Sequence, residues 1–256
     1  MTVAAVVIWT PGDPDPQPCL ESLLPQAEEV VLTVNPGGGP AVPDGVQVLA
    51  NERTLGFGSN INRGLAATSA EFVAVANPDT RAEPGALATL ERFCESHPRC
   101  GIAAPQLRYP DGTWQPSRRS FPTVGGTLVR RTPLRLVLNP HERQRSHYLF
   151  DERPTEPVRS DWFLGAFMFL RRRAIQELGG LDEGFRLYGD DIDLCYRADK
   201  AGWERWYVPA AVVTHDHQAE TDHRFLTRRT LWHWRSIVRF VRKHPETLQT
   251  RLRSRP

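Results

Sequence analysis

Short apolar runs alternate with helical patterns through the first hundred residues, and this alternation constrains the fold more than any other feature. Val3–Trp9 is a continuous apolar run, as expected of a strand buried on both faces. Further strands are predicted at 30–34, 46–49 and 72–76, and helices at 19–29, 57–68 and 84–96. The pattern is typical of a mostly parallel sheet with covering helices, so we expect an α/β fold.

Polar residues stand where these strands end. Open parallel sheets bind their ligands at the carboxyl ends of the strands, so a site is expected there. The positions concerned are Thr10, Asn35, the region 51–64 and Asn77.

The rest of the chain is less regular. Residues 106–160 are rich in Pro and Arg, and we expect loops and short helices inserted over the site. Regular structure is predicted to resume with a strand at 162–170, helices at 171–178 and 190–201, and strands at 203–208 and 211–214. A long basic amphipathic helix is predicted at 225–243, where Pro245 follows it.

Composition indicates an intracellular protein. The four cysteines lie in apolar stretches without metal-type spacing, which suits reduced thiols. The start of the chain lacks a positively charged leader, and no apolar run approaches the ~20 residues of a membrane-spanning helix. We therefore expect a cytoplasmic location, with any membrane contact peripheral and at the cytoplasmic face.

Three carboxylates fall within four positions at the start of the helix predicted at 190–201. Asp190, Asp191 and Asp193 follow Gly189 in apolar surroundings, where an acid is costly without a partner, a metal or a substrate. A helix N-terminus favours the ionised form, which suits Asp191 as a general base. The alternative is an ordinary first-turn acid. Asp193 is instead expected to pair with Arg197, four residues on.

Two further residues are candidate metal ligands. Asp79 follows a buried strand on a turn stiffened by Pro78, although Asn, Pro and Asp also make ordinary turns. His215 ends an apolar strand and can bind the same ion, although a lone His is more often structural. The glycine-rich turn that begins at Gly56 lacks the spacing of a phosphate-binding loop, so it is a weak signal alone.

These motifs occur in one order that resembles a known family. The resemblance runs from about Val3 to about His215, and its motifs are Gly56-Phe57-Gly58 with Asn62-Arg63-Gly64, Asn77-Pro78-Asp79, Ser117-x-Arg119-x-Phe121-Pro122, Trp162-x-x-Gly165-Ala166, Arg171-Arg172 with Gly179-Gly180-Leu181-Asp182-Glu183, Tyr188-Gly189-Asp190-Asp191-x-Asp193-Leu194-Cys195, Gly202-Trp203, and Tyr207-Val208-Pro209 with His215. The chain resembles the inverting family-2 glycosyltransferases of GT-A fold, a Rossmann-like architecture, and most of all their bacterial rhamnosyltransferase-like branch.

The resemblance implies a role for each candidate. Asp79 and His215 would hold Mn²⁺ or Mg²⁺ against a nucleoside-diphosphate sugar, and Asp191 would be the general base beside an acceptor-contacting Asp190. The implied substrate-binding residues are Thr10, Asn35, Gly56, Phe57, Asn62, Asn77, Arg119, Trp162, Gly165, Ala166 and Asp190. Trp162 would form an aromatic wall, the Gly165-Ala166 backbone would lie near the donor sugar, and Asn35 with 51–62 would line the nucleotide pocket.

The resemblance also implies an organisation and a reaction. We expect a single catalytic domain at 1–221, with a nucleotide-binding half at 1–105, the insertion at 106–160 and an acceptor half at 161–221. A basic helix and tail would follow at 222–256. The expected reaction transfers a sugar, rhamnose from dTDP-rhamnose being the candidate, to a glycan or polyprenyl-linked acceptor in cell-wall or surface polysaccharide synthesis. The alternative is a non-catalytic module that binds a nucleotide sugar or glycan.

The sequence departs from the family pattern around the nucleotide base. Val34-Asn35 stands where the family usually has Asp-Asn, and Thr10-Pro11 replaces the usual Tyr-Asn. Thr54 stands where an Asn is common, and Asp190-Asp191 replaces the usual Glu-Asp. Recognition of the donor base is therefore expected to differ.

Two basic features remain open at this stage. Arg118 and Arg119 can serve a diphosphate site or form a solvated loop pair. The C-terminal helix, with Leu231, Trp234, Val238 and Val241 on one stripe, can contact anionic lipid headgroups or a polyprenyl diphosphate. It can equally pack on the domain or on a second copy in a homodimer. Nothing else in the chain suggests a nucleic-acid partner.

Overall fold

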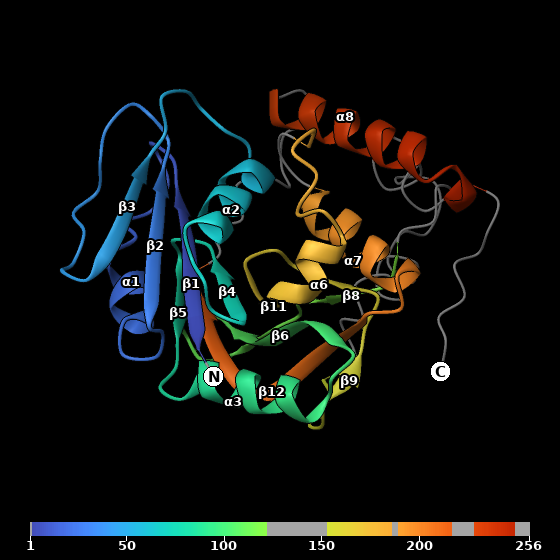
Figure 1. The fold of residues 1–256 in the computed structure, drawn as a ribbon, viewed down its shortest axis with the longest axis horizontal. Helices are drawn as coiled ribbons and strands as arrows, with labels where there is room; N and C mark the ends of the chain where they lie inside the picture. Colours follow the sequence, from blue (N-terminus) through green and yellow to red (C-terminus); the bar gives the residue numbers. More distant parts are fainter. Residues whose placement is uncertain (1, 122–152, 186–188, 217–227, 249–256) are drawn as a thin grey trace.

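A computed structural model of the chain describes residues 2–121, 153–185, 189–216 and 228–248. Within them one large mixed sheet has the strand order β3-β2-β1-β4-β11-β6-β12-β5, with β7 beside β6 and β9 beside β12 (Figure 1). Its strands are β1 (Val3–Trp9), β2 (Glu29–Val34), β3 (Val46–Ala50), β4 (Phe72–Ala76), β5 (Thr80–Ala82), β6 (Cys100–Arg108), β7 (Trp114–Gln115), β9 (Val158–Arg159), β11 (Phe167–Arg171) and β12 (Glu204–His215). A second, two-stranded sheet pairs β8 (Arg118–Arg119) with β10 (Trp162–Phe163).

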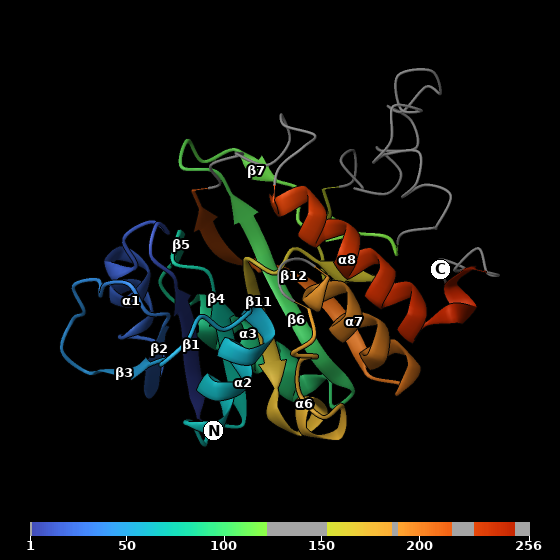
Figure 2. The same ribbon diagram turned by 90° about the horizontal axis from the view of Figure 1, so that it is seen from above.

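Helices cover both faces of the large sheet (Figures 1 and 2). They are α1 (Gln17–Leu23), α2 (Phe57–Ala66), α3 (Ala86–Ser96), α6 (Arg172–Glu177), α7 (Asp190–Lys200), α8 (Arg228–Lys243) and the 3₁₀ helix η2 (Pro245–Leu248). Leu20 of α1 and Leu90 of α3 belong to the core on one face, while Ile61 of α2 and Leu194 of α7 belong to the core on the other. The alternating inward and outward residues of the strands thus fill two separate apolar layers.

The parallel strands β1, β2, β3 and β4 end at one edge of the sheet. Thr10, Asn35, Asn51 and Asn77 follow these four ends, so the predicted strand-end positions do lie along a common edge. Gly64 lets α2 approach β1 closely, because a Cβ at this position would collide with the side chain of Val6.

The region expected as an insertion contains part of the central sheet. β6 runs from Cys100 to Arg108, which crosses the expected boundary at 105, and β7, β8 and β9 also lie within 106–160. The sequence pattern missed β6 because Pro105 interrupts it. Pro105 is tolerated there because it stands opposite Val208, where the pairing of β12 with β6 shifts register.

Two other elements differ from the sequence expectation. The strand expected at 162–170 is two strands, β10 and β11, separated by the loop 164–166. The two strands expected at 203–208 and 211–214 are one long strand, β12, with an irregularity between Val208 and Val212. Hydrophobic runs alone do not reveal such breaks and continuations.

The C-terminal helix packs on the domain. α8 lies beside α7 in both views, and Phe240 is buried against Tyr196, with ring centroids 5.6 Å apart (Figures 1 and 2). Val238 is 45% exposed, so the apolar stripe expected to include it is wrong at this position. The residues of this C-terminal segment that face the domain are Ser236, Phe240 and His244, which are all buried.

Candidate functional site

Strand pairing brings the two candidate metal ligands together. β12 runs antiparallel to β5 with His215 opposite Thr80, and the Asp216 amide donates to the Asp79 carbonyl oxygen at 2.9 Å. The Nε2 atom of His215 consequently lies 3.4 Å from Oδ2 of Asp79. Two ligands of one octahedral ion at ~2.1 Å each lie about 3 Å apart when adjacent, so this spacing fits a shared cation.

The hydrogen bonds of His215 favour a ligand role for its Nε2 atom. Its Nδ1 lies 2.8 Å from Oε1 of Gln115, an amide oxygen that only accepts, so Nδ1 carries the proton. In the neutral ring Nε2 then presents a lone pair toward the Asp79 carboxylate. Oδ1 of Asp79 is buried and has no hydrogen-bond partner. Two lone-pair-bearing atoms facing each other beside an unpaired carboxylate oxygen are well suited to a divalent cation.

The protein supplies a small ligand set. Among residues 2–121, 153–185, 189–216 and 228–248, no group of three or more His, Cys, Asp and Glu side chains is arranged to hold a metal. An ion at Asp79 and His215 would therefore need oxygens from a bound phosphate or from water to complete its coordination.

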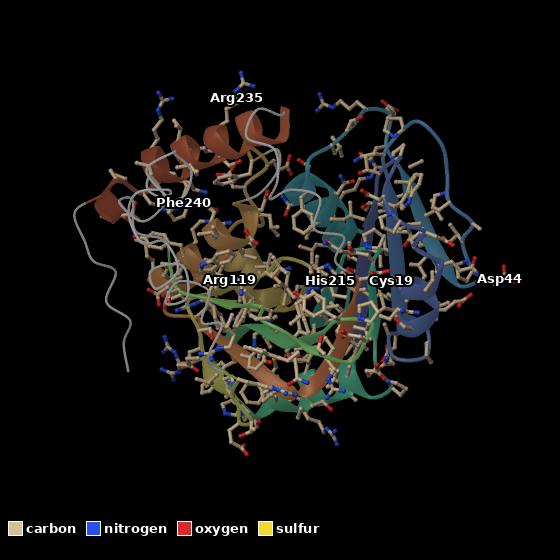
Figure 3. All side chains as sticks on the ribbon, turned by 180° about the vertical axis from the view of Figure 1, so that it is seen from behind. Cys19, Asp44, Arg119, His215, Arg235 and Phe240 are labelled. Carbon is tan, nitrogen blue, oxygen red and sulfur yellow. The ribbon has the colours of Figure 1, made fainter. Side chains whose placement is uncertain are left out.

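The turn that carries Asp79 is braced from inside the core. The Thr80 hydroxyl donates to the Asn77 carbonyl oxygen at 2.8 Å, and the Cys19 thiol lies 3.4 Å from the same oxygen. Burial raises the pKa of Cys19 to about 12, so it stays a neutral donor. Cys19 and His215 both appear in the stick view of the molecule (Figure 3).

The candidate base Asp191 lies in the first turn of α7 and is held by backbone amides. Its Oδ1 accepts from the Ile192 amide at 2.9 Å and its Oδ2 from the Gly165 amide at 3.2 Å. Burial raises the pKa of Asp191, and these amides oppose the rise by stabilising the carboxylate. A side chain at Gly165 would crowd the base, since a Cβ there would lie 3.3 Å from Oδ2 of Asp191.

The loop 164–166 connects the base to the metal pair. Its Gly165 amide donates to Asp191, and the carbonyl oxygen of the next residue, Ala166, accepts from the Asn77 amide at 2.9 Å. Asn77 begins the turn that carries Asp79. Two consecutive residues of one loop thus hold the base on one side and the metal turn on the other.

Asp190 lies against α2, near Gly58, whereas Asp191 contacts Gly165. Asp190 is 2% exposed, and its Oδ1 has no hydrogen-bond partner and would lie 3.0 Å from a Cβ at Gly58. Burial, and next the charge of Asp191, raise the pKa of Asp190 to about 7, against the effect of backbone N–H groups that include that of Gly58. Asp190 is therefore a carboxyl group that exchanges its proton near neutral pH.

Asn35 is part of a buried amide network. It is 1% exposed; its Nδ2 donates to Oγ1 of Thr10 and to the Leu55 carbonyl oxygen, and its Oδ1 accepts from the Leu55 amide and from Asn51. Asn51 also donates to Asn60, the buried asparagine of α2. The network fixes the strand-end loops to one another, so Asn35 shapes this edge of the sheet through its neighbours.

The other residues of the glycine-rich segment have distinct positions. Gly56 is the N-cap of α2, and Phe57 packs against the core below it. The Asn62 side chain forms two hydrogen bonds with the backbone of Leu181 and one with Glu183, at 2.9 to 3.0 Å. Asn62 thereby ties α2 to the segment that leads toward α7.

Arg118 and Arg119 are buried, which rules out the solvated pair. Arg119 donates to the carbonyl oxygens of Pro116 and Arg118, and Arg118 donates to the Ser160 hydroxyl. Trp162, opposite Arg119 in the small sheet, is 8% exposed and donates to the Ser120 carbonyl oxygen at 3.0 Å. Arg119 is labelled in Figure 3.

The sequence did not reveal the residues that support the site from a distance. Gln115, which orients His215, sits in a two-residue strand without a recognisable pattern. The expected ion pair of Asp193 with Arg197 is present at 2.7 Å, but its further partners on α8 were not anticipated.

Comparison with known proteins identifies the family. The family model described as "Glycosyltransferase like family 2" matches residues 37–233. The chain belongs to glycosyltransferase family 2. This confirms the resemblance read from the strand-end and acid motifs.

Relatives within the family carry rhamnosyltransferase names. The chain is 31% identical over 210 residues to N-acetylglucosaminyl-diphospho-decaprenol L-rhamnosyltransferase of Mycobacterium tuberculosis, a match that covers 77% of this chain and 66% of that protein. It is 37% identical over 93 residues to rhamnosyltransferase WbbL of Escherichia coli, covering 34% of each. The chain thus spans slightly less than two thirds of the first relative.

Solved structures of the family's fold resemble this one. GalNAc-T7 with UDP, GalNAc and Mn²⁺ superposes with a TM-score of 0.65 at 16% identity, covering 98% of this chain and 51% of that one. The mannosyltransferase PcManGT of Pyrobaculum calidifontis with GDP-Man and Mn²⁺ gives 0.60 at 15% identity, covering 96% and 64%. The expected GT-A fold is confirmed.

None of the helices in the described part of the chain has the length and apolar character needed to cross a bilayer.

Proposed function

We propose that this family-2 chain transfers a sugar from a nucleoside-diphosphate donor to a hydroxyl group, with inversion at the anomeric carbon. The proposal rests on two hydrogen bonds made by the backbone of the loop 164–166. One holds Asp191, and the other holds the turn that carries Asp79. A base for the incoming hydroxyl and a cation site for a leaving diphosphate are the two requirements of such a displacement.

Asp79 and His215 are the residues that would hold Mn²⁺ or Mg²⁺. Their 3.4 Å spacing, the orphaned Oδ1 of Asp79 and the Nδ1–H tautomer of His215 support this assignment. When bound, the ion would offset the negative charge that develops on the leaving diphosphate. The two Mn²⁺-containing structural neighbours are consistent with it.

Asp191 is proposed as the general base. Backbone amides of Ile192 and Gly165 and the N-terminus of α7 stabilise its ionised form, which accepts the hydroxyl proton. A single base opposite the leaving group gives inversion without a covalent intermediate. Asp190, beside it, is proposed to contact the acceptor.

The relatives' names suggest the donor and the acceptor. The names of both relatives support a rhamnosyl donor, with dTDP-rhamnose as our first candidate, and the mycobacterial name supports a polyprenyl-linked glycan acceptor. The altered Val34-Asn35 edge, where Asn35 is committed to the amide network, supports a donor-base contact that differs from the family's usual one.

A basic groove beside α8 supports an anionic lipid acceptor held at the cytoplasmic membrane face. The groove has a volume of about 720 Å³ and is lined by Asp182, Arg235, Val238, Arg239, Arg242 and Lys243. Arg235 and Arg242 are exposed, and Val238 between them is 45% exposed. Cations beside an exposed apolar side chain suit a lipid diphosphate or headgroup.

The experiment is a thermal-shift panel of nucleotide sugars with and without Mn²⁺, followed by donor hydrolysis and transfer assays. We expect one donor to stabilise the protein only with metal, and Asp79→Ala to abolish that effect. Asp191→Asn should keep donor binding while turnover falls ~10²-fold or more. Binding without turnover in the unaltered protein would instead identify a non-catalytic module, and metal-independent turnover would contradict the assignment of Asp79.

Membrane contact is tested separately by sedimentation with vesicles of 30% phosphatidylglycerol, a composition of about physiological charge. Arg235→Glu with Arg242→Glu should release the protein from these vesicles without changing its melting temperature. Equal binding of the charge-reversed variant would overturn the proposed contact. Concentration-dependent dimerisation lost in the same variant would assign this face to a second copy of the chain.

A further inference from the structure

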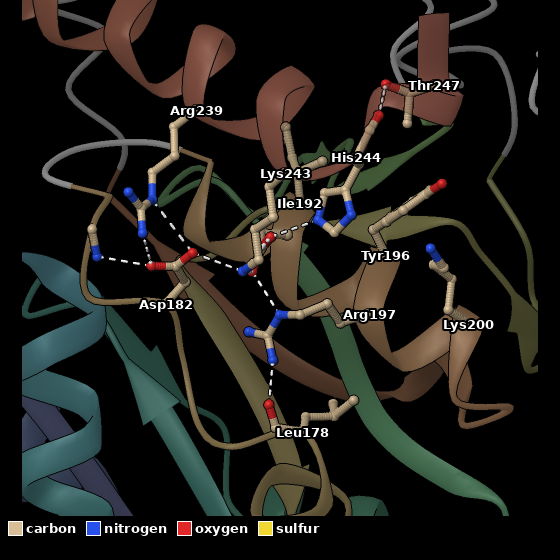
Figure 4. Close-up of polar contacts among 12 residues, drawn as sticks. Leu178, Asp182, Ile192, Tyr196, Arg197, Lys200, Arg239, Lys243, His244 and Thr247 are labelled. Carbon is tan, nitrogen blue, oxygen red and sulfur yellow. Dashed lines mark hydrogen bonds and ion pairs between the residues drawn. The ribbon is translucent and has the colours of Figure 1, made fainter. Parts of the chain in front are cut away.

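The first turn of α7 carries three carboxylates that point to three different neighbours. Asp190 faces α2 and Asp191 faces the loop 164–166, whereas Asp193 faces the C-terminal segment. Asp193 is fully buried. Its oxygens accept from Arg197 at 2.7 Å, from Lys243 at 3.0 Å and from Nε2 of His244 at 2.8 Å (Figure 4).

A second carboxylate connects α8 to the segment that precedes α7. Asp182 accepts from Arg239 and from Lys243, both at 2.7 Å (Figure 4). Burial opposes ionisation of Asp182, but hydrogen bonds from Arg239 and Lys243 outweigh it and hold the pKa of this carboxyl well below its usual range. Lys243 bridges both acids, so the two contacts act on one helix end.

Close packing accompanies these ion pairs. Gly189, the residue directly before Asp190, has φ of 94°, and a Cβ there would lie 3.5 Å from Cβ of Ser236 on α8. The Arg239 guanidinium lies against the backbone of Gly184 and 5.5 Å from the centre of the Phe185 ring. α8 therefore touches the start of the segment 182–189 and its end.

We infer that α8 is a positioning element of the active site, with His244 and Lys243 acting through Asp193, and Arg239 through Asp182, to fix the first turn of α7. The inference rests on the proposed role of Asp191 as base. Within the described residues, the hydrogen-bond partners of the Asp191 carboxylate are backbone amides. The direction of this carboxylate is thus set by where the α7 turn sits relative to the loop 164–166.

His244 is the residue that best isolates this role. Its side chain is 6% exposed, and it follows the last residue of α8. Its hydrogen-bond partner, Asp193, lies two residues after the proposed base Asp191 in α7. His244→Leu keeps the volume but removes the donor to Asp193, whereas His244→Gln keeps a donor. A displacement of the order of 1 Å at a catalytic group can cost ~10²-fold in rate, so a tenfold fall is a moderate expectation.

The matched control is Lys200→Gln. Lys200 at the far end of α7 pairs with Glu246 of η2 at 2.6 Å, so it also links α7 to the C-terminal segment, but away from the base. This pair is exposed and is expected to contribute little. Lys200→Gln therefore removes one contact of the same kind at the other end of α7, whereas positioning of Asp191 requires only the Asp193 side.

The experiment measures kcat, KM for the donor and the Mn²⁺-dependent thermal shift with donor. We expect His244→Leu to lower kcat about tenfold with KM and the donor-induced shift unchanged, and His244→Gln to restore most of kcat. Arg239→Ala, at a side chain that is 45% exposed, should lower kcat while leaving the fold intact. Lys200→Gln should match the unaltered protein.

The outcomes separate this inference from the function it rests on. If the unaltered protein transfers no sugar, the proposed function fails. If it is active and the folded His244→Leu and Arg239→Ala variants keep full kcat, or lose only donor affinity, α8 is a structural helix and the inference is wrong.

Discussion

Nε2 of His215 lies 3.4 Å from Oδ2 of Asp79, across the pairing of β12 with β5. The hydrogen bond from Nδ1 of His215 to Gln115 leaves Nε2 without a proton in the neutral ring, so that Nε2 and the Asp79 carboxylate can both bind a cation. The metal assignment therefore depends on a third residue that binds no metal itself.

Gln115→Leu is expected to weaken Mn²⁺ binding 10- to 100-fold, roughly the effect of losing an outer partner of a metal-bound His. The loss of the acceptor frees the ring to change tautomer and to rotate away from Asp79. Isothermal titration with Mn²⁺ and donor measures the change, and Gln115→Glu, which retains an acceptor, is the control. Undiminished affinity in the Leu variant would mean that Gln115 does not orient the ligand.

Gly165→Ala is expected to lower kcat by about tenfold while the protein stays folded. The added methyl group would lie 3.3 Å from Oδ2 of Asp191 and press on the base, and the hydrogen bond from the Gly165 amide would lengthen. Steady-state kinetics give the change, with Gly39→Ala as a comparison, since a Cβ at this exposed loop glycine meets nothing within 4 Å and its φ is not positive. A variant with normal kcat would show that Asp191 tolerates displacement.

Asp190 should make the stability of the metal-free protein depend on pH. Its pKa of about 7 in the folded state lies above the value of 3.8 for an unperturbed Asp, so the folded state holds a proton that the unfolded state releases. Stability is therefore expected to fall as pH rises from about 4 to about 7, by up to ~4 kcal/mol, and then to level off.

Asp190→Asn removes this proton exchange. The melting temperature of the variant, relative to the unaltered protein, should rise between pH 5 and pH 7 and level off above it. Parallel melting profiles for the two proteins over this range would rule out Asp190 as the titrating group.

Asn35→Ala is expected to destabilise the protein by about 2 kcal/mol or more, because it leaves the amides and carbonyls of its buried network without partners. Chemical denaturation gives the free energy of unfolding. Donor affinity should fall together with stability, since the same network holds the loops at the strand ends where the nucleotide is expected to bind. Asn62→Ala, in the half-buried tie to Leu181, should cost less.

The sequence predicted the sheet edge well because strand ends carry local signals. Buried runs followed by Thr10, Asn35 and Asn77 located three parallel strands correctly. It failed at β6, where Pro105 and the neighbouring polar residues hide a strand whose partners lie far away in the chain. Such a strand is specified by β11 and β12 on either side of it, and not by its own pattern.

The candidate site was predictable to the same extent. Asp79, Asp191 and His215 belong to local motifs, and the structure brings the first and last together. Gln115 and His244 have no motif, since each acts only through a contact made by folding. Residues of this kind become visible only when the elements that bear them are packed.

The irregularity in β12 has a consequence for how the chain tolerates changes in length. Val208 pairs with Pro105 of β6 and Val212 pairs with the next residue, Gln106, so residues 209–211 form a bulge that has no partner in β6. If the bulge keeps its length, a one-residue deletion within it shifts the rest of β12 by one position and brings Asp216 opposite Thr80 in place of His215. The length of this bulge therefore determines which side chain lies beside Asp79. An insertion or deletion within it would replace the His215 ligand as a point substitution does.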